Sequence, residues 1–131
     1  MMDKRQNFST GSHFEEAVGY SRAVRVGEQL FVSGTVGLDY ETRTIPADPV
    51  AQFNNAVATI ERSLEMAGAS MGDVVTLVTY VTGADVMEAI TPELKRVFGE
   101  IRPTNTALVV AFPFADIKLE LQVTALIGCG G

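Results

Sequence analysis

Residues 73–82 constrain the fold of this 131-residue chain more than any other segment. They are rich in Val and Thr, which predicts a β-strand, and both alternating faces of that strand are largely apolar. Residues 104–111 show the same two-sided character. A strand that is apolar on both faces is stable only when both faces are covered. The sequence therefore predicts a sheet that needs a cover on each side.

Two helices are expected. The first begins at Asp48-Pro49, because an aspartate can cap a helix and a proline at the first position needs no N–H partner. Its apolar residues recur every three or four positions up to Gly68. The second spans residues 85–98 and opens with a capping-box pattern, Asp85-x-x-Glu88. Pro92 predicts a break or kink near residues 90–91 of that helix.

The remaining strands are expected at residues 20–26, 30–34 and 117–127, the first two as a hairpin. The resulting order, β-β-α-β-α-β-β, predicts an α+β fold with a mixed sheet and both helices on one face. We expect a single domain over residues 1–131, with a loosely held N-terminal arm at 1–17 and a C-terminal tail at 128–131. No element is left to cover the second face, so we expect a neighbouring subunit there. A scatter of exposed valines is the alternative.

Composition excludes several classes of function. With 10 Lys and Arg against 16 Asp and Glu, the net charge is −6, so no nucleic-acid partner is expected. The lone cysteine, Cys129, excludes an internal disulfide and suits a reducing compartment. With a single histidine, His13, no metal site or cofactor is expected. No apolar run reaches the ~18 residues of a membrane span, so we expect a soluble, cytoplasmic protein with no membrane contact.

Four segments together resemble one family: residues 19–27 (GYSRAVRVG), 31–34 (FVSG), 73–75 (DVV) and 98–103 (FGEIRP). Their order and spacing are similar to those of the Rid proteins, the reactive-intermediate deaminases, also called YjgF/UK114 or endoribonuclease L-PSP. The resemblance covers roughly residues 10–128. It implies a chorismate-mutase-like α+β fold and a homotrimer with small-molecule pockets between subunits.

The resemblance also implies site residues, carried over one at a time. Tyr20 matches a pocket tyrosine, and Ser33, which precedes Gly34, matches a pocket serine. The deaminase arginine, which grips a substrate carboxylate, is replaced by Asn105, and the glutamate that assists attack of water on an imine falls at Gln122. Ala107 stands where many members have a cysteine. The candidate ligand-binding residues are Tyr20, Ser33, Gly34, Asn105, Ala107 and Gln122.

The two replacements set what chemistry is expected. Asn105 cannot form a bidentate ion pair, and Gln122 cannot accept a proton, so both suit a neutral ligand better than an anion. Deaminase activity is therefore expected to be altered or lost. Glu120 shares the face of Gln122, but replacing the lost carboxylate is expected to need a shift in strand register.

Each candidate also has an ordinary interpretation. Gln122 suits the solvated side of a strand, Asn105 a turn and Tyr20 a core or interface aromatic. His13 and Arg102 suit surface positions, and Cys129 an exposed tail.

Three function classes stay open. The first is an imine or enamine hydrolase, and the second is a trimer that binds a small metabolite without turnover. The third is the ribonuclease or translation inhibitor of the older family name, which the acidic balance and the single histidine disfavour.

Overall fold

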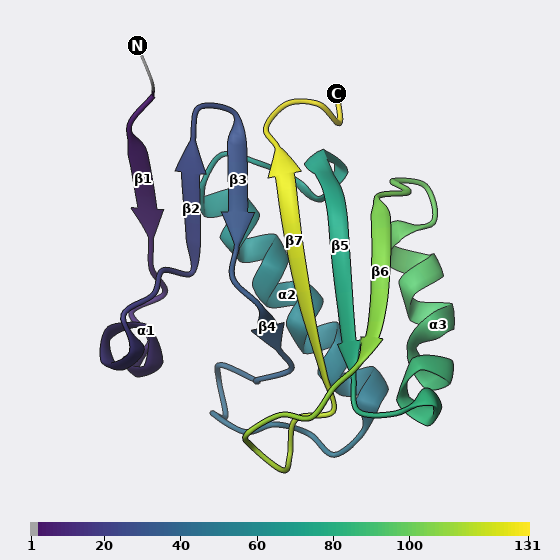
Figure 1. The fold of residues 1–131 in the computed structure, drawn as a ribbon. Coiled ribbons are helices and arrows are strands. Elements are labelled where there is room, and N and C mark those ends of the chain that lie inside the picture. Colours follow the sequence, from purple (N-terminus) through teal and green to yellow (C-terminus); the bar gives the residue numbers. More distant parts are fainter. Residues whose placement is uncertain (1–2) are drawn as a thin grey trace.

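One mixed sheet organises the computed structural model, which describes residues 3–131 (Figure 1). The strand order is β1-β2-β3-β7-β5-β6, with a short β4 also paired to β7. Only β5 and β6 run parallel; the other pairs are antiparallel. The strands are β1 (Arg5–Phe8), β2 (Ala23–Val26), β3 (Gln29–Val32), β4 (Thr35–Val36), β5 (Val74–Val81), β6 (Thr104–Val109) and β7 (Leu119–Leu126). The helices are α1 (His13–Val18), α2 (Pro49–Met66) and α3 (Ala84–Phe98), with a 3₁₀ turn η1 (Met71–Asp73).

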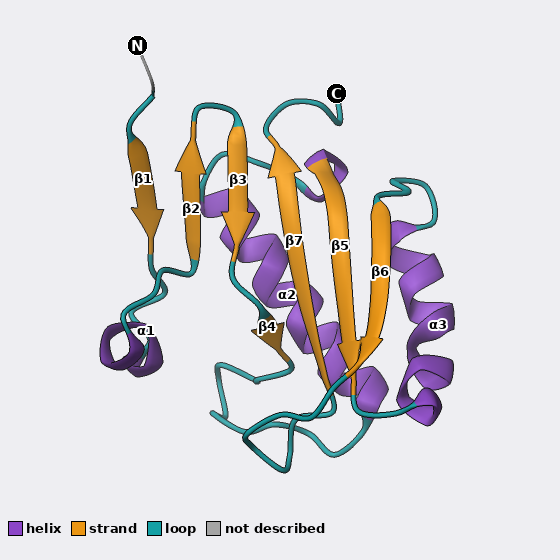
Figure 2. Ribbon diagram, in the orientation of Figure 1, coloured by secondary structure: helices purple, strands orange, loops and turns teal. Residues whose placement is uncertain are grey.

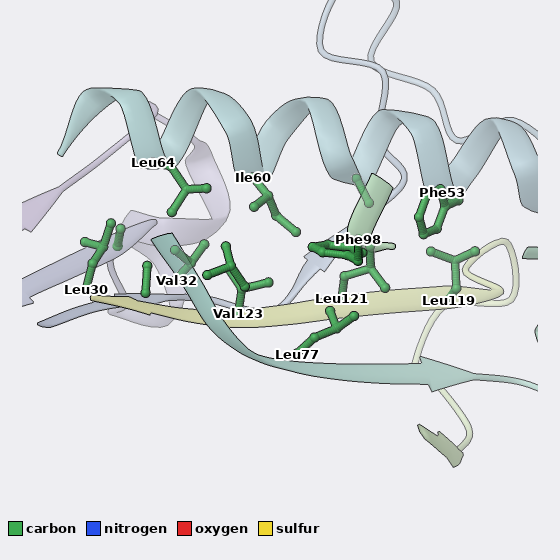
Figure 3. Packing of buried hydrophobic residues seen from close by; sticks show 14 of the residues in the cluster. Leu30, Val32, Phe53, Ile60, Leu64, Leu77, Phe98, Leu119, Leu121 and Val123 are labelled. Carbon is green, nitrogen blue, oxygen red and sulfur yellow. The ribbon is translucent and has the colours of Figure 1, made fainter. Parts of the chain in front are cut away.

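Helix α2 covers the centre of the sheet and confirms the first helix prediction (Figure 2). Asp48 caps it, since its Oδ1 accepts from the Val50 N–H at 3.2 Å. Phe53, Ile60 and Leu64 point from α2 onto the side chains of β3, β5 and β7 (Figure 3). Helix α3 adds Phe98 to the same core, so α2 and α3 lie on one face, as expected.

The last strand alternates as its sequence predicts. Leu119, Leu121, Val123 and Ala125 are buried beneath the helices, while the residues between them face the other side of the sheet. On that other side, large apolar side chains stay exposed, among them Phe31 and Leu126, and Leu108 at 47%. The two-sided apolar character read from the sequence therefore leaves an apolar surface on this chain.

The expectation of a loose N-terminal arm was wrong for most of residues 1–17. Residues 5–8 form strand β1 against β2, and residues 13–18 form helix α1, capped by the Ser12 hydroxyl at 3.2 Å from the Phe14 nitrogen. The polar sequence of β1 gives no amphipathic signal, because its side chains are largely exposed on an edge strand. Residues 1–2, which the prediction also included, lie outside the described residues.

The second helix also differs from its prediction. Helix α3 runs through Pro92 without a break, and Gly83 rather than Asp85 is its N-cap. Pro92 is exposed, so water can reach the carbonyl that its ring leaves without a partner. The reciprocal capping box belongs instead to Ser70 and Asp73 at η1.

A buried glutamine in the first turn of α2 joins the loops that lead into α2 and β7. The Gln52 side-chain amide donates to the carbonyls of Pro46 and Asp116 at 2.8 and 2.9 Å and accepts from the Lys118 N–H at 3.1 Å. Gly37 packs directly on the backbone of Gln52. These contacts hold the loops beside the start of β7, where the candidate site lies.

Candidate functional site

A break between β3 and β4 forms the floor of the candidate site. Both strands pair with β7, but their registers differ by one residue: Phe31 lies opposite Thr124, whereas Thr35 lies opposite Leu121. Ser33 and Gly34 occupy the break. Such an irregularity bends a strand and turns its backbone groups away from the ladder, a common feature beside functional sites.

Arg22 lies beneath this break and is only 5% exposed. Its Nη2 donates to the carbonyls of Ser33 and Gly34 at 2.6 and 3.0 Å and to the Thr35 hydroxyl at 2.8 Å. The Ser33 hydroxyl donates to the Ser21 carbonyl at 2.6 Å. The predicted site residue Ser33 is therefore part of an ordered segment, with its hydroxyl bonded to the neighbouring strand.

Tyr20 reaches the site from the end of α1. Gly19 ends that helix in the left-handed conformation, and the Tyr20 N–H donates to the Glu15 carbonyl at 3.0 Å. The phenol is partly exposed. Burial raises the pKa of Tyr20, the Arg22 charge opposes that rise, and the charges of Glu15 and Glu120 add to it.

Glu120 is the acidic group of the site. It lies on β7 opposite Val36 of β4 and Tyr80 of β5, and its carboxylate packs against the Cα of Gly34. A Cβ at position 34 would collide with Oε1 of Glu120, so a larger residue there would displace the carboxylate. Burial raises the pKa of Glu120, and the Arg22 charge opposes this rise. A half-buried carboxyl group with a raised pKa is a candidate for a group that accepts and returns a proton.

This geometry revises the role expected for Gln122. Its side chain is exposed, and its Oε1 accepts from the Tyr80 hydroxyl at 2.8 Å. The carboxylate of Glu120, one alternation earlier on the same face of β7, lies against Gly34. The register shift expected for Glu120 is found in the β3–β4 segment, whose pairing with β7 changes by one residue. The glycine that follows Ser33 was the sequence signal for a close approach at this point.

Asn105 and Ala107 lie elsewhere. On the edge strand β6 they pair with Leu77 and Thr79, whose side chains face the helices. The Asn105 Oδ1 accepts from the Thr79 hydroxyl at 3.0 Å. Ala107 lines a groove of about 400 Å³ between β6 and α3. Its other lining residues are mostly apolar: Val81, Ala84, Met87, Glu88, Thr91, Leu108 and Val109.

The predicted site residues therefore form two clusters in one chain. The strand-break cluster contains Tyr20, Ser33 and Gly34, and the structure adds Arg22 and Glu120 to it. The groove cluster contains Asn105 and Ala107. Neither includes Gln122.

His13, Arg102 and Cys129, for which surface positions were expected, lie outside both clusters. The His13 ring lies against Phe14, with ring centroids 6.1 Å apart. Arg102 makes no ion pair with any residue from 3 to 131 and occupies a turn with φ of 55°. Cys129 is exposed, and its thiol contacts the Asp73 carbonyl at 3.6 Å.

Fold and site together define a small α+β protein with an open groove beside β6 and a carboxyl group at a strand break. The chain belongs to the family described as Endoribonuclease L-PSP, whose model matches residues 10–127. No helix within residues 3–131 has the length and apolar character needed to cross a membrane.

Relatives and solved structures agree with this assignment. A RutC family protein of Pyrococcus abyssi is 31% identical over 81% of this chain and 84% of its own. "Putative reactive intermediate deaminase TdcF" of Escherichia coli is 29% identical over 84% and 88%. Rv2704 of Mycobacterium tuberculosis, described as a member of the YjgF/YER057c/UK114 family, is 36% identical with a TM-score of 0.85, over 95% of this chain and 100% of that one. The expected Rid/YjgF family and its α+β fold are thus confirmed.

Proposed function

We propose that this protein is a small-molecule hydrolase of the imine-deaminase type, with Glu120 as its acid–base group. The observation that carries the proposal is the half-buried Glu120 carboxyl group, held against Gly34 with a raised pKa. The name of the Escherichia coli relative, which refers to a reactive intermediate deaminase, supports the same chemistry.

The proposed reaction needs one proton acceptor that later acts as a donor. The Glu120 carboxylate takes a proton from water while the water oxygen bonds to the carbon of a C=N group. Protonated Glu120 gives this proton to the nitrogen, which yields a neutral carbinolamine. The carbinolamine hydroxyl then passes its proton through Glu120 to the nitrogen as the C–N bond breaks and the C=O bond forms. The products are a carbonyl compound and ammonia, and Glu120 returns to its starting state.

The substrate is proposed to be less anionic than a 2-imino acid. Asn105 presents a neutral amide where the resemblance implies an arginine, and its Oδ1 already accepts from Thr79. A neutral amide binds a carboxylate less strongly than a guanidinium does, by roughly 1.5–3 kcal/mol. An imine carrying an amide, ester or hydroxyl group fits this site better.

We also propose that the working unit is a homotrimer in the cytoplasm. Phe31, Leu108 and Leu126 leave an apolar surface on the face opposite the helices, which a second copy would cover. The two site clusters lie on different faces of the sheet, so a pocket that uses both needs residues of two chains. The single cysteine is consistent with a reducing compartment.

Ammonia release from 2-iminopropanoate and from its neutral amide, each generated in situ, tests the proposal. The wild type is expected to accelerate hydrolysis of the neutral imine more than that of the anion. Glu120→Gln is expected to lose about 10²- to 10⁴-fold in rate. Gln122→Glu serves as the matched control on the same face and is expected to stay within about threefold of wild type, because Gln122 lies outside both clusters.

Asn105→Arg is expected to raise the preference for the anionic over the neutral imine by about 10-fold or more, because the guanidinium group can form a bidentate ion pair with the carboxylate. The second candidate function, a trimer that binds without turnover, rests on the neutral Asn105. It would be favoured if the wild type released no ammonia from either compound while both raised its melting temperature. RNA cleavage that survives repurification and disappears in Glu120→Gln would favour the ribonuclease instead.

A further inference from the structure

Arg22 is a buried cation with no carboxylate partner. Within residues 3–131 the ion pairs join Arg25 to Glu28 and Arg96 to Glu93, and none includes Arg22. The guanidinium instead meets the neutral oxygens of Ser33, Gly34 and Thr35, and its buried Nε has no acceptor among the described residues. Burying a charge is costly unless other charges compensate it, and the Arg22 charge acts on the carboxylates of Glu15 and Glu120.

The contacts of Arg22 decide how the backbone of the strand break is oriented. Both the Ser33 and the Gly34 carbonyls turn toward the guanidinium. Because a trans peptide is planar, the N–H that follows each carbonyl points the opposite way. The Gly34 N–H therefore points away from Arg22, and no described residue outside the strand ladders accepts from it. The Glu120 carboxylate packs against the Cα of this same glycine.

Arg22 is also the cation that acts on the titrating groups of the site. Its charge opposes the rise in the pKa of both Glu120 and Tyr20. The other groups that face Glu120 are Tyr80 on β5 and the apolar Val36 on β4. Gln122 flanks it on the same face of β7, and Lys118 directly precedes that strand.

We propose that Arg22 is the positioning residue of this site: its buried guanidinium fixes the Ser33–Gly34 backbone and holds the charge that balances Glu120. The catalytic importance of Arg22 rests on the proposed function. Its effects on the Ser33–Gly34 backbone and on the titration of Glu120 can be measured without substrate. Arg22 touches neither substrate nor reacting atoms in this assignment, since it acts through Gly34 and Glu120.

The test is an NMR titration of the Glu120 side-chain carboxyl carbon, together with hydrogen exchange of the Gly34 amide. In Arg22→Gln the Glu120 midpoint is expected to rise by about one pH unit, because the opposing charge is removed. Arg25→Gln is the matched control. Arg25 lies on β2, which begins directly after Arg22, and also donates to backbone carbonyls, those of Gly27 and Ala67 at 2.9 and 3.0 Å. It is expected to leave both signals unchanged.

Arg22→Lys keeps the charge but loses the fork, so it covers the case in which the glutamine variant does not fold. It is expected to keep the Glu120 midpoint near that of wild type while the Gly34 amide shifts and exchanges faster. An unchanged Gly34 amide in Arg22→Lys would overturn the positioning role. An unchanged Glu120 midpoint in a folded Arg22→Gln protein would overturn the electrostatic role. Neither result depends on turnover, so a failure of the proposed function is recognised separately by the ammonia assay.

Discussion

Asn105 and Gln122 lie on opposite faces of one sheet, two strands apart. Asn105 pairs with Leu77, which faces the helices, whereas Gln122 pairs with Val78 on the other face. Their hydrogen bonds follow the same division, since Asn105 bonds to the buried Thr79 and Gln122 to Tyr80. One pocket of a single chain therefore cannot be lined by both residues. The groove beside Ala107 and the strand break beside Glu120 meet only if two copies of the chain meet.

Mixing two inactive variants tests this arrangement. Ala107→Phe fills the groove, and Glu120→Gln removes the acid–base group, so each protein alone is expected to be inactive. Subunits refolded together at equal amounts would form some pockets with both parts intact, restoring about one quarter of the wild-type activity. Activity and mass are measured on the same sample, by ammonia release and light scattering. A mixture that exchanges subunits and stays inactive would argue that each chain works alone.

Removing the Glu120 charge is expected to stabilise the protein at neutral pH. Because burial raises the folded-state pKa of Glu120, the stability that its neutral form contributes is fully present below the unfolded pKa and is lost as the pH rises through the folded pKa. Glu120→Gln stays neutral throughout. Its melting temperature at pH 7 is therefore expected to exceed that of wild type by a few degrees, with the gap closing below about pH 4.

The control for this measurement is Glu28→Gln, since the Glu28 side chain is 70% exposed. It is expected to melt with wild type at both pH values. A Glu120→Gln protein that gains nothing at pH 7 would contradict the raised pKa.

Two glycine substitutions should separate activity from stability. Gly34→Ala places a methyl group against the Glu120 carboxylate, the far end of a flexible side chain, so activity is expected to fall while the melting temperature changes little. Gly37→Ala places a methyl group against the backbone of Gln52, which cannot move aside. This substitution is expected to lower the free energy of unfolding by about 1–3 kcal/mol. Thermal unfolding and the ammonia assay check both. Equal stability losses would mean that Glu120 is as rigid as the α2 backbone.

Asp73 is expected to anchor the C-terminal tail. This buried carboxylate accepts from the Gly130 N–H at 2.9 Å and the Ser70 N–H at 3.0 Å. Burial alone would raise the pKa of Asp73, but these hydrogen bonds hold it below its ordinary value. The stability it contributes is thus present above the unfolded pKa and lost as the pH falls through the folded pKa.

Asp73→Asn is therefore expected to cost about 1–3 kcal/mol at pH 7, measured by urea unfolding, and less below about pH 4. Asp116→Asn, at an exposed position, is the control and is expected to change little. A constant cost across this pH range would show that geometry, rather than charge, accounts for the loss.

The elements that sequence analysis predicted best depend on local patterns. Helix α2 combines an Asp48 cap with a continuous apolar stripe, and β7 alternates strictly from Leu119 onward. Both signals are complete within one segment. Strand β1 and the two-residue β4 gave no such signal, because each exists through hydrogen bonds to a strand distant in sequence.

The candidate site also has one part that local sequence patterns predict and one part that depends on contacts between distant segments. The chain alone determined the family, the sheet with two helices on one face, and the presence of Tyr20, Ser33 and Gly34 near one another, because short motifs and hydrophobic periodicity encode these features. Whether Glu120 or Gln122 meets Gly34 was decided by tertiary structure. Both side chains project from the same face of β7, and the choice depends on a one-residue change of register in strands paired to it. That change of register lies in the Ser33–Gly34 segment, which bonds to the buried Arg22, and no local pattern in β7 contains it.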